Sequence, residues 1–157
     1  MKRLFWIVFA GLMGCADPAP EPVDAIPPSG SSVPRVDDAR IIAAAATEPG
    51  SWLSYGQDYR EQRFSQLSQI TRENVGQLGL AWSKPIGGNT ERMQGTPLVA
   101  DGVMYVTNGW SVVYALDAAT GEEIWTYDPE TDREYVKHSC CGGVVNRGVA
   151  LYEGNVY

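Results

Sequence analysis

The sequence is poor in histidine and cysteine and carries an excess of negative charge. Its 157 residues include one histidine and three cysteines, and they contain no Cys-x-x-Cys-His motif for covalent haem attachment. Nineteen acidic residues against twelve basic ones give a formal net charge of −7 at pH 7. Because an acidic surface repels phosphate backbones, this composition argues against nucleic acid as a partner.

The N-terminal apolar run, residues 4–14, is too short to span a bilayer comfortably, since a transmembrane helix needs about 20 residues. Lys2 and Arg3 precede the run, which is the layout of an export signal. It ends at Gly14-Cys15 and so resembles the signal of a bacterial lipoprotein, in which Cys15 would be acylated and become the mature N-terminus. An ordinary cleaved signal and an uncleaved anchor are the alternatives. We therefore expect a periplasmic lipoprotein anchored in a membrane, with the outer membrane as one option.

Residues 15–35 are rich in proline and serine, a composition that cannot bury a core, and we interpret them as an extended tether. Residues 36–78 follow as an N-terminal extension, in which cap residues stand before two helix-forming stretches. The expected helices run from an Asp37 or Asp38 cap through Ala46, and from a Thr71 cap through Leu78.

Residues 79–157 show short β-branched and aromatic runs separated by turn signals, which is typical of an antiparallel all-β architecture. The dipeptide Asp101-Gly102 between two such runs is a strong signal for a two-residue hairpin. Residues 117–121 separate a second pair of runs, so the pattern predicts one four-stranded unit. The expected strands cover residues 96–100, 103–107, 111–116 and 123–127.

The same pattern restarts further along the chain. Residues 149–157 align with residues 97–105 at an offset of 52, and the alignment superposes both acidic-Gly turns and both closing tyrosines. A four-stranded repeat of about 40–50 residues indicates a β-propeller blade. The long loop 128–147, named the cysteine loop here, expands this repeat, and long loops often carry function. The predicted fold class is therefore all-β, with a first propeller blade and the start of the next.

The cysteine loop contains the adjacent pair Cys140-Cys141. Neighbouring Cα atoms lie about 3.8 Å apart, below the ~4.4–6.8 Å usual in disulfides, so a bond between the two would close a small strained ring. Such a bond is readily reduced and needs an oxidising compartment, which export would supply. Two ordinary buried thiols, or cysteines paired elsewhere, are the alternative interpretation.

Gln94 precedes an expected innermost strand by two residues, and its counterpart in the next repeat is Asn146, beside Arg147. In a propeller the innermost strands of successive blades surround a central channel. Residues that enter those strands should therefore converge. We expect Gln94, the cysteine loop and Arg147 to lie at one mouth of the channel.

Several motifs together carry a family resemblance. They are a blade-docking motif at residues 115–125, the pair Cys140-Cys141, the tripeptide Asn-Arg-Gly at 146–148 and the N-terminal stretch 52–80. At these residues the chain resembles the pyrroloquinoline-quinone (PQQ) dependent alcohol dehydrogenases, the quinoprotein family whose fold is an eight-bladed propeller. The resemblance implies that the chain is an N-terminal fragment, truncated within the second blade.

The resemblance also implies a role for each candidate site residue. Cys140 and Cys141 would form a vicinal disulfide that lies flat against the quinone. Arg147 would donate hydrogen bonds to the quinone oxygens, where negative charge builds as hydride arrives. Gln94 stands where the family commonly has a Glu that touches the cofactor. A metal, calcium or a lanthanide, would act as a Lewis acid, and its ligands and the catalytic Asp base would come from later blades, so none is expected in this fragment.

Two departures from the family pattern bear on the cofactor. The family's Glu-x-Thr-Pro reads Gln-Gly-Thr-Pro at residues 94–97, which keeps hydrogen-bonding capacity but loses the charge. One extra residue also separates the cysteine pair from Asn146. The Gly pair at 142–143 could absorb it as a bulge, or it could move the sulfur atoms away from the cofactor. A family member that has lost the cofactor is therefore one alternative.

The leading hypothesis is an exported PQQ-dependent dehydrogenase that oxidises an alcohol or related hydroxyl substrate and passes electrons to cytochrome c or a quinone. The alternative from another class is a non-catalytic propeller lipoprotein of the outer-membrane protein assembly type, which binds protein partners. The adjacent cysteines favour the enzyme, because a scaffold has no use for a strained disulfide in the channel mouth.

Overall fold

The computed structural model describes residues 33–87, 92–138 and 143–157. The signal-like run, Cys15 and the tether up to residue 32 lie outside these ranges, as do Cys140 and Cys141. Among the described residues no helix is long and apolar enough to cross a membrane. The elements in chain order are α1 (Asp38–Thr47), η1 (Val75–Gln77), β1 (Arg92–Met93), β2 (Leu98–Ala100), β3 (Val103–Thr107), β4 (Val113–Asp117), β5 (Glu123–Tyr127), η2 (Arg133–His138), β6 (Val145–Asn146), β7 (Leu151–Tyr152) and β8 (Asn155–Val156).

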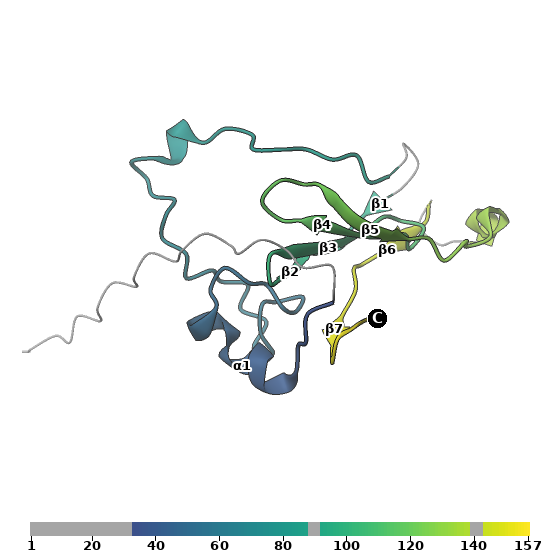
Figure 1. Cartoon of the computed structure of the whole chain (residues 1–157). Helices are drawn as coiled ribbons and strands as arrows, with labels where there is room; N and C mark the ends of the chain where they lie inside the picture. The colour runs from purple at the N-terminus through teal and green to yellow at the C-terminus, as the bar shows by residue number, and fades with distance from the viewer. Residues whose placement is uncertain (1–32, 88–91, 139–142) are drawn as a thin grey trace, which may run out of the picture.

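A four-stranded antiparallel sheet in the order β2-β3-β4-β5 forms the body of the described chain (Figure 1). The turn between β2 and β3 has positive φ angles at Asp101 (50°) and Gly102 (76°), as a two-residue hairpin requires. Leu98, Val103 and Tyr105 are almost fully buried and form the centre of the core. The four strands expected from the sequence are confirmed as one sheet.

The loop between β3 and β4 is built around the buried side chain of Asn108. Its Oδ1 accepts hydrogen bonds from the backbone N–H groups of Trp110 and Val112, both at 3.0 Å. Between these two residues Ser111 has a φ of 66°, outside the range of a strand. For this reason β4 begins at Val113 rather than at residue 111 as expected.

The turn between β4 and β5 packs against Trp82, which precedes the sheet in the chain. The Trp82 Nε1 donates a hydrogen bond to the Ala118 carbonyl oxygen at 3.2 Å. Gly121 has a φ of 74°, and a Cβ atom there would lie 2.5 Å from the Trp82 ring. Only glycine fits at this position without a shift of the ring, and the docking of residues 115–125 onto another blade stays a prediction.

β7 and β8 form a second antiparallel hairpin whose turn repeats the first. Glu153 and Gly154 have φ angles of 47° and 78°, close to those of the β2–β3 turn. The Glu153 N–H donates to the Val36 carbonyl oxygen at 2.7 Å, so the N-terminal extension is bonded to this hairpin. The repeat inferred from the sequence alignment is thereby confirmed.

Helix α1 forms as expected and ends one residue beyond its predicted end. The Asp37 side chain caps it by accepting a hydrogen bond from the Arg40 N–H at 2.8 Å. Ile41 and Ala44 are buried in one cluster with Leu98 of β2. In Figure 1 the helix lies below β2, so its apolar face covers that edge of the sheet.

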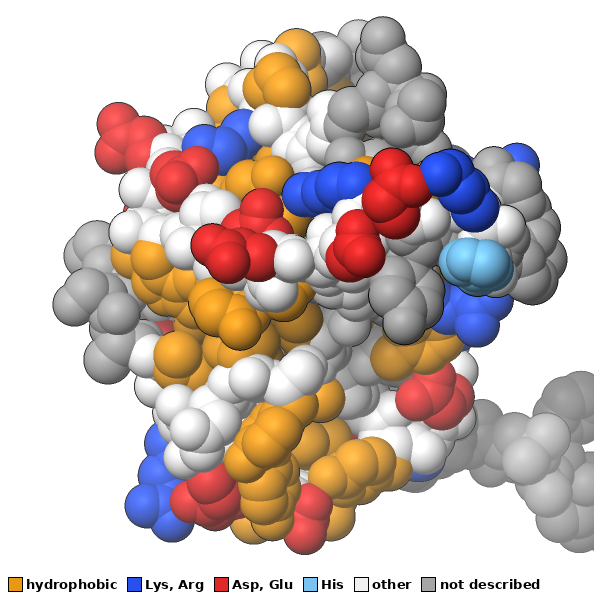
Figure 2. Space-filling view, turned by 90° about the vertical axis from the view of Figure 1, so that its right-hand side faces the viewer, with side chains coloured by type: hydrophobic (Ala, Val, Ile, Leu, Met, Phe, Trp, Pro, Cys, Tyr) orange, Lys and Arg blue, Asp and Glu red, His pale blue; other side chains and the backbone are white. Residues whose placement is uncertain are grey.

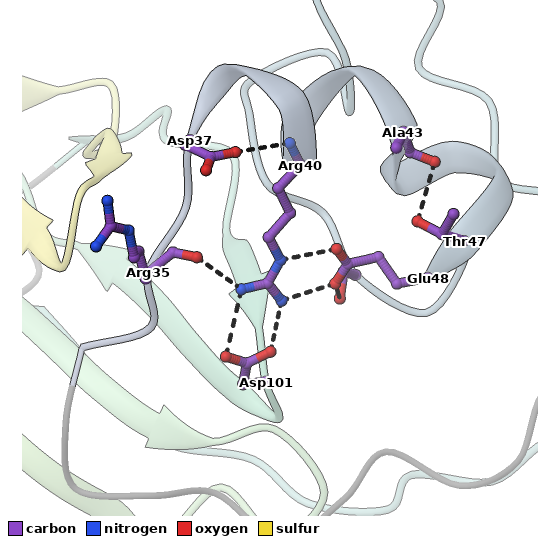
Figure 3. A network of polar contacts seen from close by, with 8 residues as sticks. Arg35, Asp37, Arg40, Ala43, Thr47, Glu48 and Asp101 are labelled. Carbon is purple, nitrogen blue, oxygen red and sulfur yellow. Dashed lines mark hydrogen bonds and ion pairs between the residues drawn. The ribbon is translucent and has the colours of Figure 1, made fainter.

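The Arg40 side chain joins α1 to the sheet (Figure 3). Its Nε and Nη2 each donate to the Glu48 carboxylate at 2.8 Å, and Nη1 donates to the Arg35 carbonyl oxygen at 3.0 Å. Nη2 also donates to Asp101 Oδ1 in the β2–β3 turn at 2.5 Å. The hydrogen bonds to Glu48, and to a lesser extent those to Asp101, raise the pKa of Arg40 above its ordinary value. The guanidinium therefore stays positively charged.

The prediction of a second helix is wrong in extent. Between Thr71 and Leu78 only the single 3₁₀ turn η1 forms. Val75 and Leu78 are 51% and 59% exposed, so no buried apolar face offsets the cost of helix nucleation. Gly76 lowers the helix propensity as well. The segment instead runs as a long connection above the sheet (Figure 1).

Candidate functional site

Two short strands far apart in the sequence meet beside the sheet. β1 and β6 pair in parallel (Figure 1). Gln94 follows β1 directly and Arg147 follows β6 directly, so the pairing brings these two residues together. The register opposes Arg92 to Val145 and Met93 to Asn146.

A pocket of about 420 Å³ opens next to this pair. Gln94 and Arg147 both line it, as does Gly143 from the cysteine loop. The described residues that the repeat pattern predicted to converge therefore line one pocket, and its place at a mouth of the propeller channel stays a prediction. Cys140 and Cys141 fall outside the described residues, and their disulfide stays a prediction. The other lining residues are Arg92, Gly109, Trp110, Ser111, Thr131, Val144 and Val145.

Alternate residues of the two paired segments face the pocket. Arg92 and Gln94 line it, whereas Met93 between them does not. From Val145 onward the second segment behaves in the same way: Val145 and Arg147 line the pocket and Asn146 does not, although Val144, just before β6, lines it too. This alternation is the period of an extended strand. The short β1–β6 ladder thus places Arg92, Gln94, Val145 and Arg147 in the pocket wall.

Asn146 fixes the backbone beside Arg147. Its Oδ1 accepts hydrogen bonds from Thr107 Oγ1 and from the Gly148 N–H, both at 2.8 Å. Its Nδ2 donates to Ser111 Oγ at 2.9 Å. The side chain therefore joins β6 to the end of β3 and to the loop that follows. This role was not predicted, because its side-chain partners lie 39 and 35 residues away in the sequence.

The backbones that leave β1 and β6 approach each other closely at two glycines. A Cβ atom at Gly95 would lie 3.2 Å from the Gly148 nitrogen and 3.3 Å from the Arg147 carbonyl carbon. Gly148 itself has a φ of 111°, which other residues rarely adopt. Glycine at both positions lets the segment after Gln94 pack directly against the segment after Arg147.

Trp110 supplies an aromatic part of the pocket wall. The Arg133 guanidinium carbon lies 4.3 Å from the centre of its ring, in a cation–π contact. Thr131 Oγ1 donates to the Trp110 carbonyl oxygen at 3.3 Å. The start of the cysteine loop is thereby bonded to the β3–β4 loop. Trp110 was not among the predicted site residues, because the sequence alone does not show that these loops meet.

The described lining of the pocket is basic, although the chain as a whole is acidic. Two lining residues are arginines and none is Asp or Glu. On the side of the molecule shown in Figure 2, by contrast, charged side chains of both signs are interspersed. In the parts of the chain that the structure describes, no group of three or more His, Cys, Asp or Glu could hold a metal ion. The arrangement of these lining residues suits an anionic ligand.

A family model matches most of the chain. It is described as "PQQ: Glucose/ethanol/alcohol dehydrogenase, beta-propeller domain" and covers residues 52–156. The chain belongs to this family. The resemblance drawn from the cysteine pair and the Asn-Arg-Gly motif is thus confirmed, and the described strands are part of a PQQ dehydrogenase propeller.

Relatives in the PQQ dehydrogenase family share about half of the aligned residues. The chain is 55% identical over 124 residues to quinohemoprotein alcohol dehydrogenase ADH-IIG of Pseudomonas putida, which covers 78% of this chain and 17% of the relative. It is 51% identical over 108 residues to 1-butanol dehydrogenase (cytochrome c) of Thauera butanivorans, covering 69% of this chain and 15% of that relative. The crystal structure of quinohemoprotein alcohol dehydrogenase from Comamonas testosteroni superposes with a TM-score of 0.74 at 51% identity, covering 81% of this chain and 18% of that one. The chain therefore spans less than a fifth of the length of these relatives.

Proposed function

We propose that the chain is part of an exported PQQ-dependent dehydrogenase that oxidises the CH–OH group of an alcohol and passes electrons to a cytochrome c or a quinone. The observation that carries the proposal is the basic pocket that Gln94 and Arg147 both line, within a chain of the PQQ dehydrogenase family. The names of the relatives support an alcohol as substrate, and the name of the Thauera relative supports cytochrome c as acceptor.

The lining residues fit PQQ, which is a flat quinone with three carboxylates. A volume of about 420 Å³ lies within the ~300–1,000 Å³ range of small-molecule sites. Guanidinium groups bind carboxylates through paired N–H donors, and the Trp110 ring offers an apolar face to a planar molecule. When bound, PQQ would supply a two-electron acceptor for the hydrogen removed from the alcohol.

Each predicted residue has a distinct part in this proposal. Arg147 holds a permanent positive charge where the quinone oxygens gain electron density. Gln94 offers a hydrogen bond there without a charge. Cys140 and Cys141, if joined as a disulfide, would give the cofactor a rigid face. Calcium or a lanthanide would supply a Lewis acid, and its ligands and the Asp base would come from later blades of the propeller.

Export and a lipid on Cys15 would hold the enzyme at a periplasmic membrane surface. The charged, then apolar, then Gly-Cys arrangement of the N-terminus supports this part of the proposal. Labelling with a radioactive fatty acid should mark the wild-type protein and leave the Cys15→Ser variant unmarked. Equal labelling of both proteins would show that the lipid is not on Cys15.

The activity is tested on the complete gene product, prepared without cofactor and reconstituted with PQQ and either calcium or lanthanum. We expect PQQ-dependent dye reduction with a panel of primary and secondary alcohols. Bound PQQ without turnover on any alcohol would contradict the proposed reaction. Failure to bind PQQ would support the non-catalytic propeller instead. Intact mass with and without reductant should also differ by two hydrogens, which tests the disulfide separately.

A further inference from the structure

We propose that Arg92 is a second carboxylate-binding residue of the pocket, acting together with Arg147. The inference rests on the proposed function, because the ligand is taken to be PQQ. Arg92 was not among the site residues predicted from the sequence. Its assignment comes from the β1–β6 pairing and from the charges of the lining residues.

The ladder directs both arginines to the same side. Arg92 is paired with Val145, and Arg147 lies two residues beyond Val145. Residues two apart in an extended segment share a face. Arg92 and Arg147 therefore reach the pocket from neighbouring segments, and both are among its lining residues.

Neither guanidinium has a side-chain hydrogen bond or ion pair with any residue in the described ranges. Three arginines elsewhere in the chain do have such partners: Arg40 pairs with Glu48, Arg60 with Asp58 and Arg133 with Asp128. Two cations that line the same pocket repel each other unless a negative charge lies between them. The described lining of the pocket holds these two arginines and no Asp or Glu, so an anionic ligand bound there would neutralise their charge.

PQQ carries three carboxylates, so more than one cation can contribute to its binding. Arg147 is proposed to serve the quinone oxygens, which leaves the three carboxylates of the cofactor to be bound by other groups. Arg92 offers five N–H donors in a planar fork that matches a carboxylate. Gln94, on the same face as Arg92, adds no negative charge that would weaken this attraction. The wall should therefore select a quinone that carries carboxylates over a neutral quinone.

The test measures equilibrium binding of PQQ to the cofactor-free complete gene product, with wild type compared with Arg92→Gln. The matched control is Arg72→Gln, which removes the same charge from an exposed position outside the pocket. We expect Arg92→Gln to bind PQQ about tenfold more weakly and the control to bind as wild type does. The difference should shrink in about 1 M salt, where the Debye length is ~3 Å. It should vanish for the trimethyl ester of PQQ, which has no carboxylate charge.

The outcomes separate this inference from the proposed function. If Arg92→Gln binds PQQ as tightly as the control while Arg147→Gln binds it more weakly, the inference is wrong and the proposed function stands. If wild-type protein does not bind PQQ, the proposed function fails and the inference fails with it. Arg92→Lys should recover part of the salt-dependent affinity. An unchanged circular dichroism spectrum and melting temperature would show that a loss of binding is not a loss of folding.

Discussion

Single glycines determine how closely neighbouring segments approach around the blade. At Gly121 the missing Cβ leaves room for the Trp82 ring, and at Gly95 it leaves room for the backbone of Gly148. Both contacts join segments that are remote in the sequence. The contact at Gly121 holds the segment that precedes the sheet against the β4–β5 turn. The contact at Gly95 packs the backbone directly beside Arg147, whose side chain lines the pocket.

Gly121→Ala should destabilise the protein by about 2–4 kcal/mol, because the new Cβ would lie 2.5 Å from the Trp82 ring at a φ of 74°. Urea unfolding followed by tryptophan fluorescence measures the change. Gly50→Ala is the matched control, since a Cβ there meets nothing within 4 Å, and its effect should stay within about 0.5 kcal/mol. Equal effects of the two substitutions would contradict the packing argument.

Arg147→Ala should reduce turnover by about a hundredfold or more and change stability by less than about 0.5 kcal/mol, because the side chain is exposed at the pocket and its function is to hold negative charge on the ligand. Steady-state rates on the reconstituted complete protein and urea unfolding of the same preparation provide the comparison. A parallel loss of activity and stability would assign a structural role to Arg147.

At the scale of secondary-structure elements, Asp101 has two separate structural roles. It adopts a φ of 50° in the β2–β3 turn, and its carboxylate binds Arg40 of α1. The turn belongs to the hairpin alone, whereas the ion pair joins the hairpin to the helix. A substitution that keeps one task and removes the other can measure each.

Asp101→Asn should cost about 0.5–1 kcal/mol, because asparagine tolerates a positive φ but cannot form the ion pair with Arg40. Asp101→Ala should cost about 1 kcal/mol more, since alanine is strained at that φ. Urea unfolding of the two variants gives the difference directly. If both variants are equally stable, the turn contributes nothing and the ion pair accounts for the whole effect.

The elements that were predicted correctly from the sequence are those whose conformation is determined by neighbouring residues. The Asp101-Gly102 turn requires positive φ angles that this dipeptide favours, and the Asp37 cap lies next to the helix that it begins. The second helix was predicted wrongly because its stability depends on burial, which the residues around Val75 do not achieve. β1 and β6 have two residues each, and two residues show no periodicity.

At the scale of the whole molecule, the core contains a buried titratable side chain, Tyr105. Tyr105 is 1% exposed, and burial, followed by the charge of Asp101, raises its pKa to about 12. In the unfolded chain a tyrosine titrates near pH 10. The folded protein therefore binds this proton more tightly than the unfolded chain does. The contribution of this proton to the free energy of unfolding is fully present below pH 10 and is lost as the pH rises toward 12.

At pH 11 the wild-type protein should be less stable than at pH 9 by about 1 kcal/mol on account of Tyr105. Tyr105→Phe lacks the hydroxyl group and should not show this part of the decline. Urea unfolding of both proteins at the two pH values isolates the contribution, because the other tyrosines titrate in both. An identical alkaline decline in the two proteins would contradict the raised pKa.

The site was partly predictable at this scale. Gln94 and Arg147 could be placed together because a repeat in the sequence implies a symmetric position in space, and the pocket contains both. Trp110 and Arg92 could not be found in this way, because their positions depend on loops and on a ladder that join distant parts of the chain. A repeat in the sequence therefore indicates where a site lies, whereas the other residues that line it are known only from the long-range contacts of the structure.

The β1–β6 ladder also has a consequence for the order of folding. It closes a loop of 53 residues with only two residue pairs, so it gains little until the hairpins between them have formed. The pocket should assemble late and open early in native fluctuations. A ligand bound there would favour the closed form by mass action. Hydrogen exchange at the Arg92 amide, which donates to the Val144 carbonyl oxygen at 3.4 Å, should therefore slow when the pocket is occupied.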